Sequence, residues 1–264
     1  MKKYFVIGNP INHSLSPKLH NYWLKQNNIN AVYEKVKLEE NEIENFFLKI
    51  KNQEISGCNV TVPFKKLVIP FLDKLSSEAE HTQSVNTIFL HNGDLVGHNT
   101  DIGGFQKAIN SLDYKVKDKK ILILGAGGVV PSLIFALNKM EASEIVVSNR
   151  TSKKAEDLKF KFNKINTVSW GEVPYFDMII NATSLGLNKE TIDLDTSNIG
   201  EGKFFYDVIY NPSETNFLNL GKKLGHQTEN GKLMFIYQAF EAFKLWHGIQ
   251  PNVSDEILKL LNHD

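Results

Sequence analysis

A glycine-rich turn near the middle of the chain has the spacing of a nucleotide phosphate-binding loop. In the stretch LILGAGGVV, Gly125, Gly127 and Gly128 follow an apolar run and precede a helical pattern. Glycines allow a tight turn that leaves backbone amides open to a pyrophosphate, which the dipole of the following helix also favours. The third small position of this fingerprint is Val130, which is larger than usual. A bare strand-to-helix turn is the alternative interpretation.

The residues after the next expected strand discriminate between the two nicotinamide cofactors. An NAD site usually has a carboxylate about 20 residues beyond the glycines, where it binds the adenosine ribose. This chain has SNRTSKK there, with no acidic residue. Arg150 can stack on adenine and bind a 2′-phosphate, Thr151 can cap the next helix, and Lys153 or Lys154 adds positive charge. We therefore expect NADP, and a solvated basic helix face is the alternative.

Two serines stand at an expected helix start in GNPINHSLSPKLHN, residues 8–21. Ser16 followed by Pro17 is typical of an N-cap and a first helical position. Hydroxyl groups at a helix start also suit an anion, because hydrogen bonds to a charged acceptor are stronger than neutral ones. From the residues alone, capping is the favoured interpretation of Ser16.

The first hundred residues predict a mixed arrangement of strands and helices. A short apolar strand over 4–7 ends at a Gly-Asn-Pro turn, and CNVTVP is a second strand. A helix with Ile43, Phe46, Phe47 and Ile50 on one stripe begins at Asn41, with Glu44 completing a capping box. Alternating residues around Asn92-Gly93 predict a hairpin with a two-residue turn. Asp101 then caps a helix that carries Ile102, Phe105, Ile109 and Leu112.

The second half of the chain alternates strands with helices. Apolar runs predict strands at 121–124 and 144–149 and near 166–170, 177–182, 203–210 and 226–229, with helices at 131–139 and around Ala155, Leu158 and Phe162. This alternation predicts a parallel, doubly wound sheet that binds ligands at the carboxyl ends of its strands. A long helix follows Gly231, with Leu233, Ile236, Tyr237, Phe240 and Phe243 on one face, and Ser254 caps a last short helix. The predicted fold class is α/β with two domains.

Composition excludes several classes of partner. The 264 residues include 30 basic and 30 acidic side chains, so no charge excess favours nucleic acid or an anionic membrane. Cys58 is the single cysteine and forms no internal disulfide, which suits a reducing compartment. The apolar start is too short for a signal peptide, and no run is long enough to span a membrane. The eight histidines lack metal-binding spacing. We expect a cytoplasmic protein without a metal.

With these residues in view, the chain resembles the shikimate dehydrogenases over nearly its whole length. The motifs that carry the resemblance, in order, are GNPINHSLSPKLHN, GCNVTVPFK, SVNT, GHNTD, GAGG with NRT, YDVIYNPSET and NGKLMFIYQAFEAFKLWHG. Each could occur by chance alone, and it is the seven in this order and at suitable spacing that carry the resemblance. The resemblance implies the reversible, NADPH-dependent reduction of 3-dehydroshikimate to shikimate, a step towards chorismate and the aromatic amino acids.

The resemblance also assigns roles to individual residues. Lys65 matches the catalytic lysine of the family, and Asp101 matches the aspartate paired with it. A lysine cation can stabilise the developing oxyanion and deliver a proton, while the carboxylate orients it and binds a substrate hydroxyl. Judged without the resemblance, Lys65 and Lys66 are a surface pair and Asp101 is a helix cap.

The remaining implied site residues form two sets. By resemblance, Ser14, Ser16 and Tyr210 bind the substrate carboxylate. The substrate-binding set is completed by Asn59, Thr61, Lys65, Asn86, Asp101 and Gln238, and the NADP-binding set is Gly125, Ala126, Gly127, Gly128, Val129, Asn149, Arg150, Thr151, Lys154, Val208 and Gly231. We expect a substrate domain over 1–101, completed by the helices in 238–264, and a Rossmann-type NADP domain over 102–237. The two ligands would meet between them, in a monomer or a homodimer.

Three other functions stay open. A quinate/shikimate dehydrogenase tolerates an extra ring hydroxyl, but Ser14, Ser16 and Arg150 favour shikimate and NADP. A catalytically idle NADP-binding sensor is less favoured because Lys65 and Asp101 are both present. A folate-type dehydrogenase of similar plan has no use for the SLSP and NVTVP motifs.

Overall fold

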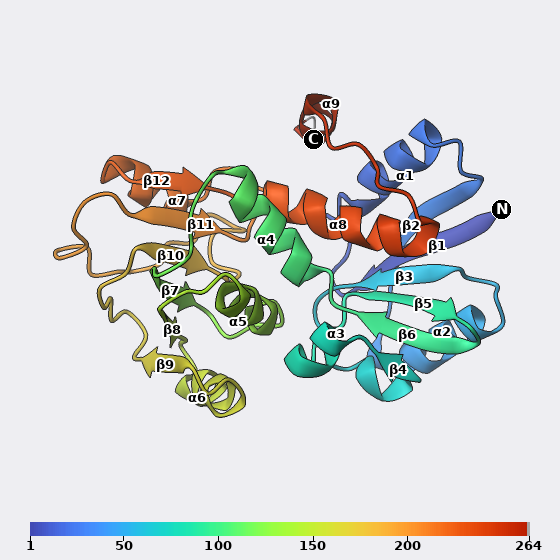
Figure 1. Ribbon diagram of the computed structural model, residues 1–264, viewed down its shortest axis with the longest axis horizontal. Helices are drawn as coiled ribbons and strands as arrows, with labels where there is room; N and C mark the ends of the chain where they lie inside the picture. Colours follow the sequence, from blue (N-terminus) through green and yellow to red (C-terminus); the bar gives the residue numbers. More distant parts are fainter. Residues whose placement is uncertain (263–264) are drawn as a thin grey trace. The chain divides into compact units, whose positions relative to one another are not determined.

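The computed structural model describes residues 1–262 and divides the chain into two compact units. Unit 1 comprises Met1–Gly104 and Ile236–Asp264, and unit 2 comprises Phe105–Phe235. Both boundaries fall inside helices, α4 (Asp101–Ser111) and α8 (Lys232–His247). Each unit contains one six-stranded sheet (Figure 1).

The sheet of unit 1 is mixed, with the strand order β2-β1-β3-β5-β6-β4. Its strands are β1 (Lys2–Gly8), β2 (Ala31–Lys37), β3 (Gly57–Val60), β4 (Lys74–Leu75), β5 (Thr87–His91) and β6 (Asp94–His98). Its helices are α1 (Ser16–Gln26), α2 (Ile43–Lys51), α3 (Ser77–Thr82) and α9 (Asp255–Leu260), with most of α8. The predicted hairpin is confirmed: β5 and β6 pair antiparallel across Asn92 and Gly93, which both have positive φ.

Successive side chains of β1 pack on opposite faces of the sheet of unit 1. Phe5 contacts Phe46 of α2, and the predicted α2 stripe is buried, as expected. Tyr4 stacks on Trp246 of α8 with ring centroids 4.7 Å apart. The hydrophobic core of this unit therefore has two layers, one under α2 and one under α8.

The sheet of unit 2 is wholly parallel, with the order β12-β11-β10-β7-β8-β9. Its strands are β7 (Lys120–Leu124), β8 (Glu144–Ser148), β9 (Ile165–Val168), β10 (Met178–Asn181), β11 (Phe204–Asp207) and β12 (Gln227–Glu229), and its further helices are α5 (Val130–Lys139), α6 (Ser152–Lys161) and α7 (Asn216–Lys223). The strand order reverses between β7 and β10, which confirms the predicted doubly wound, Rossmann-type sheet.

Several predicted helix starts are wrong in detail. Ser16 is the first residue of α1 and Leu15 is its N-cap, without a side-chain hydrogen bond. The capping box lies at Glu39 and Glu42, which begin a short 3₁₀ turn before α2, and not at Asn41. Asp101 is likewise the first helical residue of α4. Short polar side chains near a helix start all satisfy the capping pattern, so the pattern alone does not select one.

The buried face of α8 also differs from the prediction. Ile236 and Phe243 are buried as expected, whereas Leu233, Tyr237 and Phe240 are partly exposed. Met234, Phe235, Ala239 and Ala242 are buried in addition. A helix that is apolar on several sides has no single stripe that the sequence could identify. None of the helices in residues 1–262 is long and apolar enough to cross a membrane.

A buried histidine makes the stability of unit 1 depend on pH. His20 of α1 is 1% exposed and stacks on Tyr33 with ring centroids 4.2 Å apart. Burial, with a smaller contribution from the charge of His247, lowers the pKa of His20 to about 3. Between the ordinary histidine pKa and this value, the unfolded chain binds a proton that the folded chain does not. The free energy of unfolding therefore falls as the pH falls through this window.

We expect His20→Phe to remove the contribution of His20 to the fall in the free energy of unfolding at low pH. That contribution is worth up to about 1.4 kcal/mol per pH unit. Urea unfolding at pH 7, 6, 5 and 4 measures the slope in the variant and in wild type. The exposed His91→Gln serves as the control and should keep the wild-type slope. An unchanged slope in His20→Phe would show that His20 is not the group responsible.

Candidate active site

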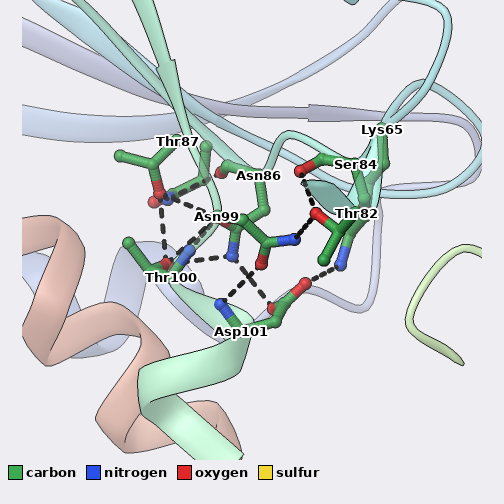
Figure 2. Close-up of polar contacts among 9 residues, drawn as sticks. Lys65, Thr82, Ser84, Asn86, Thr87, Asn99, Thr100 and Asp101 are labelled. Carbon is green, nitrogen blue, oxygen red and sulfur yellow. Dashed lines mark hydrogen bonds and ion pairs between the residues drawn. The ribbon is translucent and has the colours of Figure 1, made fainter. Parts of the chain in front are cut away.

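Lys65 and Asp101 form a nearly buried ion pair in unit 1. The Lys65 Nζ atom lies 2.5 Å from Asp101 Oδ2, and the two side chains are 13% and 7% exposed (Figure 2). Lys65 lies in the loop after β3, which is anchored by the buried Phe64 and Val68. Its backbone carbonyl accepts a hydrogen bond from the Val85 N–H. The neighbouring Lys66 is exposed, so the two lysines are not a solvated surface pair.

Asp101 is held by hydrogen bonds on both its side chain and its backbone. Its Oδ1 atom accepts a hydrogen bond from Asn86 Nδ2 at 2.9 Å. Its backbone N–H donates to Asn99 Oδ1 at 3.2 Å, and Asn99 in turn donates to Thr82 Oγ1 at the end of α3. The carboxylate therefore binds other side chains. The prediction that it caps α4 is wrong.

This arrangement is suited to stabilising a negative oxygen. An ammonium held by a fixed carboxylate, with little access to water, can stabilise charge that develops on a nearby oxygen and give that oxygen a proton. Two charges of opposite sign also cost less to bury together than either does alone. The pair is thus chemically competent for the reduction of a carbonyl group.

Asn59 belongs to the same hydrogen-bonded group and is also buried. Its Nδ2 donates to the Asn86 carbonyl at 3.1 Å and to Thr87 Oγ1 at 3.0 Å, while its Oδ1 accepts from the Tyr33 hydroxyl at 2.7 Å. Both amide hydrogens are therefore used within unit 1. Among the residues assigned by resemblance, the structure directly links Lys65, Asp101, Asn86 and Asn59.

Ser14 and Ser16 lie together at the start of α1. Ser14 Oγ accepts a hydrogen bond from the Ser16 N–H at 3.3 Å. Ser16 is buried, and its hydroxyl makes no capping bond to α1. The favoured interpretation of Ser16 as a helix cap is therefore wrong, because the helix begins one residue earlier than predicted.

Thr61 and Gln238 are both placed by close contacts with glycines. A Cβ atom at Gly8 would lie 2.6 Å from Thr61 Cγ2, so the end of β1 packs directly on Thr61. A Cβ atom at Gly104 would lie 2.8 Å from the backbone nitrogen of Gln238. The first turn of α4, which carries Asp101, thereby packs against the part of α8 that carries Gln238.

The glycine turn of unit 2 lies at the carboxyl end of β7, at the switch point of the sheet. Gly125 has a φ of 110°, and its N–H donates to the Ser148 carbonyl at 2.7 Å. A Cβ atom there would lie 2.9 Å from the Ala182 carbonyl oxygen. Gly127 and Gly128 are exposed, and no side chain caps α5. The turn fits a pyrophosphate, because only glycine can occupy its first position, two exposed glycines follow, and the turn leads directly into the start of α5.

Of the remaining turn residues, Ala126 lies between Gly125 and Gly127, and Val129 directly precedes α5, where Val130 is fully buried. After β8, Asn149 donates from Nδ2 to the Thr151 carbonyl at 2.8 Å, which orders the segment that carries Arg150. Thr151 occupies the N-cap position of α6 without a side-chain cap bond. Arg150 and Lys154 are exposed beside the glycine turn, since β7 and β8 are neighbours. This basic group suits a 2′-phosphate.

Val208 and Gly231 are in direct contact at the same edge of the sheet. A Cβ atom at Gly231 would lie 2.1 Å from the Val208 carbonyl oxygen, so position 231 admits no side chain without movement. Tyr210, two residues further on, stacks on Phe235 with ring centroids 4.5 Å apart. Val208 and Gly231 belong to unit 2, as do all the other members of the NADP-binding set and Tyr210.

Sequence reasoning missed a buried carboxylate that shapes this edge. Asp207 ends β11 and accepts hydrogen bonds from Asn181 Nδ2, the Ile209 N–H and Thr215 Oγ1. Burial raises the pKa of Asp207. The bonds fix the loop that carries Val208 and Tyr210. Two signals in the sequence could have indicated Asp207: its position at the end of an apolar strand and its place in the motif YDVIYNPSET. Thr87, Asn99 and Thr100 were missed as well, although all three lie in or beside the quoted motifs.

Among residues 1–262, no group of three or more His, Cys, Asp or Glu side chains is arranged to hold a metal ion.

Three family models match successive parts of the chain. A model for the shikimate dehydrogenase substrate binding domain matches residues 6–88, one for shikimate / quinate 5-dehydrogenase matches 106–193, and one for the shikimate 5′-dehydrogenase C-terminal domain matches 233–255. A shikimate dehydrogenase (NADP(+)) from Pelagibacter ubique is 56% identical over 264 residues, which cover 99% of this chain and 100% of that protein.

Solved structures agree with these matches. A shikimate dehydrogenase in complex with NADP⁺ has a TM-score of 0.92 at 33% identity and covers 99% of this chain and 95% of its own. The enzyme from Thermus thermophilus, in complex with NADP(H) and shikimate, has a TM-score of 0.89 at 31% identity, with coverage of 96% and 95%.

The two adjacent glycines of α4 should respond differently to alanine. We expect Gly104→Ala to lower the free energy of unfolding by about 1–3 kcal/mol, because the new methyl group would overlap the backbone of Gln238. Gly103→Ala is the matched control: its Cβ would lie 3.4 Å from the flexible Glu241 side chain, so it should be neutral or stabilise the helix by up to about 1 kcal/mol. Urea unfolding of both variants measures the difference. Equal effects would argue against the close contact.

Proposed function

This chain belongs to the shikimate dehydrogenase family, and we propose that it catalyses the reversible NADPH-dependent reduction of 3-dehydroshikimate to shikimate. The observation that carries the proposal is the nearly buried Lys65–Asp101 pair. It is supported by the family models, the first of which includes Lys65, while Asp101 lies between the first and the second. A carbonyl reduction needs a proton donor at the oxygen that becomes a hydroxyl, and the pair can supply one.

In the proposed mechanism, Lys65 acts on the ketone oxygen. NADPH supplies the hydride when it is bound. The Lys65 ammonium stabilises the charge that develops on the oxygen and then gives it a proton. Asp101 holds the ammonium in place through Oδ2 and accepts a hydrogen bond from a substrate hydroxyl. In the reverse direction, the neutral lysine takes the proton back.

The substrate is proposed to bind through neutral polar groups. Ser14 and Ser16 donate to its carboxylate, and the hydroxyl of Ser16 is available for this because it does not cap α1. Tyr210 of unit 2 supplies a third donor. Thr61 and Gln238 meet the ring hydroxyls, while Asn59 and Asn86, whose amide hydrogens are all used internally, support them. Sites of this kind strongly reject analogues that lack a hydroxyl.

The cofactor is proposed to be NADP, bound along the carboxyl edge of the sheet in unit 2. The glycine turn takes the pyrophosphate, and Asn149, Arg150, Thr151 and Lys154 take the adenosine end with its 2′-phosphate. Val208 and Gly231 line the nicotinamide end. In this proposal residues 1–101 and 238–264 form the substrate domain and residues 102–237 the NADP domain. A cytoplasmic location is proposed as well, since the buried single cysteine needs no oxidising compartment.

Quinate is the second candidate substrate. The family model over residues 106–193 is described for both shikimate and quinate. Quinate carries one more ring hydroxyl. Unless the site offers that hydroxyl an additional polar contact, quinate should bind more weakly than shikimate.

The decisive experiment follows NADPH formation at 340 nm with purified protein. Shikimate and quinate are each tested with NADP and with NAD in parallel. We expect turnover with shikimate and NADP to exceed the other three combinations. No turnover with either acid would overturn the proposal, and a preference for quinate with NAD would support the second candidate.

We expect Lys65→Ala to lower kcat by about 10²–10⁴-fold, the usual contribution of a general acid, with KM for shikimate changed only modestly. Lys66→Ala is the matched control, because this adjacent lysine is exposed, and its kcat should stay near wild type. Since removing Lys65 leaves a carboxylate without its cation, thermal unfolding must first show that the variant is folded at the assay temperature. An unchanged kcat with much weaker shikimate binding would contradict the catalytic role.

A further inference from the structure

The Asn86 amide lies at the centre of a closed set of hydrogen bonds beside the ion pair (Figure 2). Its Nδ2 donates to Asp101 Oδ1 and to Thr100 Oγ1, both at 2.9 Å. Its Oδ1 accepts from the Thr100 N–H at 2.7 Å and from the hydroxyls of Thr100 and Thr87 at 3.1 and 3.2 Å. Two pairs of consecutive residues thus bind each other through their side chains. One pair is Asn86 and Thr87 at the start of β5, and the other is Thr100 and Asp101 at the start of α4.

The orientation of the Asn86 amide is fixed by one backbone group. The Thr100 N–H can only donate, so the atom of Asn86 that faces it must be the amide oxygen. The amide nitrogen must then face Asp101. Its two hydrogens go to the Asp101 carboxylate and to the Thr100 hydroxyl, so neither is left over.

Thr87 continues the set away from the ion pair. Its hydroxyl accepts a hydrogen bond from Asn59 Nδ2 at 3.0 Å and lies 3.2 Å from Thr100 Oγ1. Thr87 is fully buried, and Asn86 and Thr100 are at most 5% exposed. Water therefore does not readily replace either hydroxyl, and a buried N–H that loses its acceptor must move or stay unsatisfied.

We propose that the hydroxyls of Thr87 and Thr100 are positioning groups for the reaction: they hold the Asn86 amide in the place from which its N–H fixes Asp101, and thereby Lys65. This inference rests on the proposed function. Among the described residues, neither threonine is hydrogen-bonded to Lys65, and Thr87 has no hydrogen bond to Asp101. Both act through Asn86.

The expected consequence is on rate. When the Thr100 hydroxyl is removed, one Asn86 N–H loses its acceptor, and the amide shifts to find another. Asp101 then loses a fixed donor, and the ammonium bound to its other oxygen moves with it. Displacement of a catalytic group by about 1 Å can cost up to about 100-fold in rate.

The test compares Thr87→Val and Thr100→Val, which remove a hydroxyl at nearly constant volume, with Thr87→Ser and Thr100→Ser, which keep it. We expect kcat for shikimate oxidation to fall at least about tenfold in the valine variants and to stay within about threefold of wild type in the serine variants. KM for NADP should stay within about twofold, because no NADP-binding residue is altered. Thermal unfolding is measured in parallel.

Two outcomes would overturn the proposal. If the valine variants lose stability but keep kcat at a temperature where they are folded, the hydroxyls are merely structural. If the serine variants lose as much kcat as the valine variants, the threonine methyl groups matter and not the hydroxyls. Should a valine variant fail to fold, the corresponding alanine variant removes the same hydroxyl without adding bulk, and the same two outcomes apply.

A double-mutant cycle tests whether Thr100 acts through Asn86. In an Asn86→Ala background we expect Thr100→Val to change kcat by no more than about twofold, because the amide it positions is already absent. An undiminished loss would show that Thr100 acts by another route. Wild-type turnover separates this proposal from the broader one: an inactive wild type overturns the proposed function, whereas an active wild type with fully active valine variants overturns only this inference.

Discussion

The nearly buried ion pair between Lys65 and Asp101 is the constraint around which unit 1 is organised. Removing two charges from water is costly, and their mutual attraction offsets that cost only when the remaining donors and acceptors are also satisfied. Here the second carboxylate oxygen binds Asn86 and the Asp101 N–H binds Asn99. The loop after β3, the start of β5 and the start of α4 must therefore converge on one point, and the β5–β6 hairpin sets the distance along the chain between the last two.

Unit 2 depends instead on close approaches between backbones. The glycine turn after β7 lies against the Ala182 carbonyl, and Gly231 lies against Val208, at the carboxyl ends of neighbouring parallel strands. Such contacts leave no room for a Cβ atom, so glycine is required by geometry. The buried Asp207 adds a polar anchor for the loop after β11. Unit 1 thus contains a charged pair, and unit 2 contains an exposed glycine turn at the start of a helix.

Features with a local cause could be predicted from the sequence. The Asn92-Gly93 turn, the buried stripe of α2 and the parallel sheet all follow from short-range patterns, and the structure has them. The caps at Ser16, Asn41 and Asp101 were wrong because several nearby polar residues fit the same pattern. The roles of Thr87 and Thr100 could not be predicted, because each depends on a partner that tertiary structure brings close. The substrate-site residues came from the family resemblance, whereas the glycine turn and Arg150 could be predicted from their own pattern.

The choice of a neutral amide at position 86 follows from the charges beside it. A lysine or arginine there would also bind Asp101, but it would compete with Lys65 for the carboxylate and repel its ammonium. A hydrophobic residue would leave Asp101 Oδ1 without a donor. An amide holds that oxygen with an N–H and adds no net charge, so the attraction between Asp101 and Lys65 is undiminished. Neutral hydroxyls at positions 87 and 100 extend the same solution, since they fix the amide without adding net charge near the ammonium.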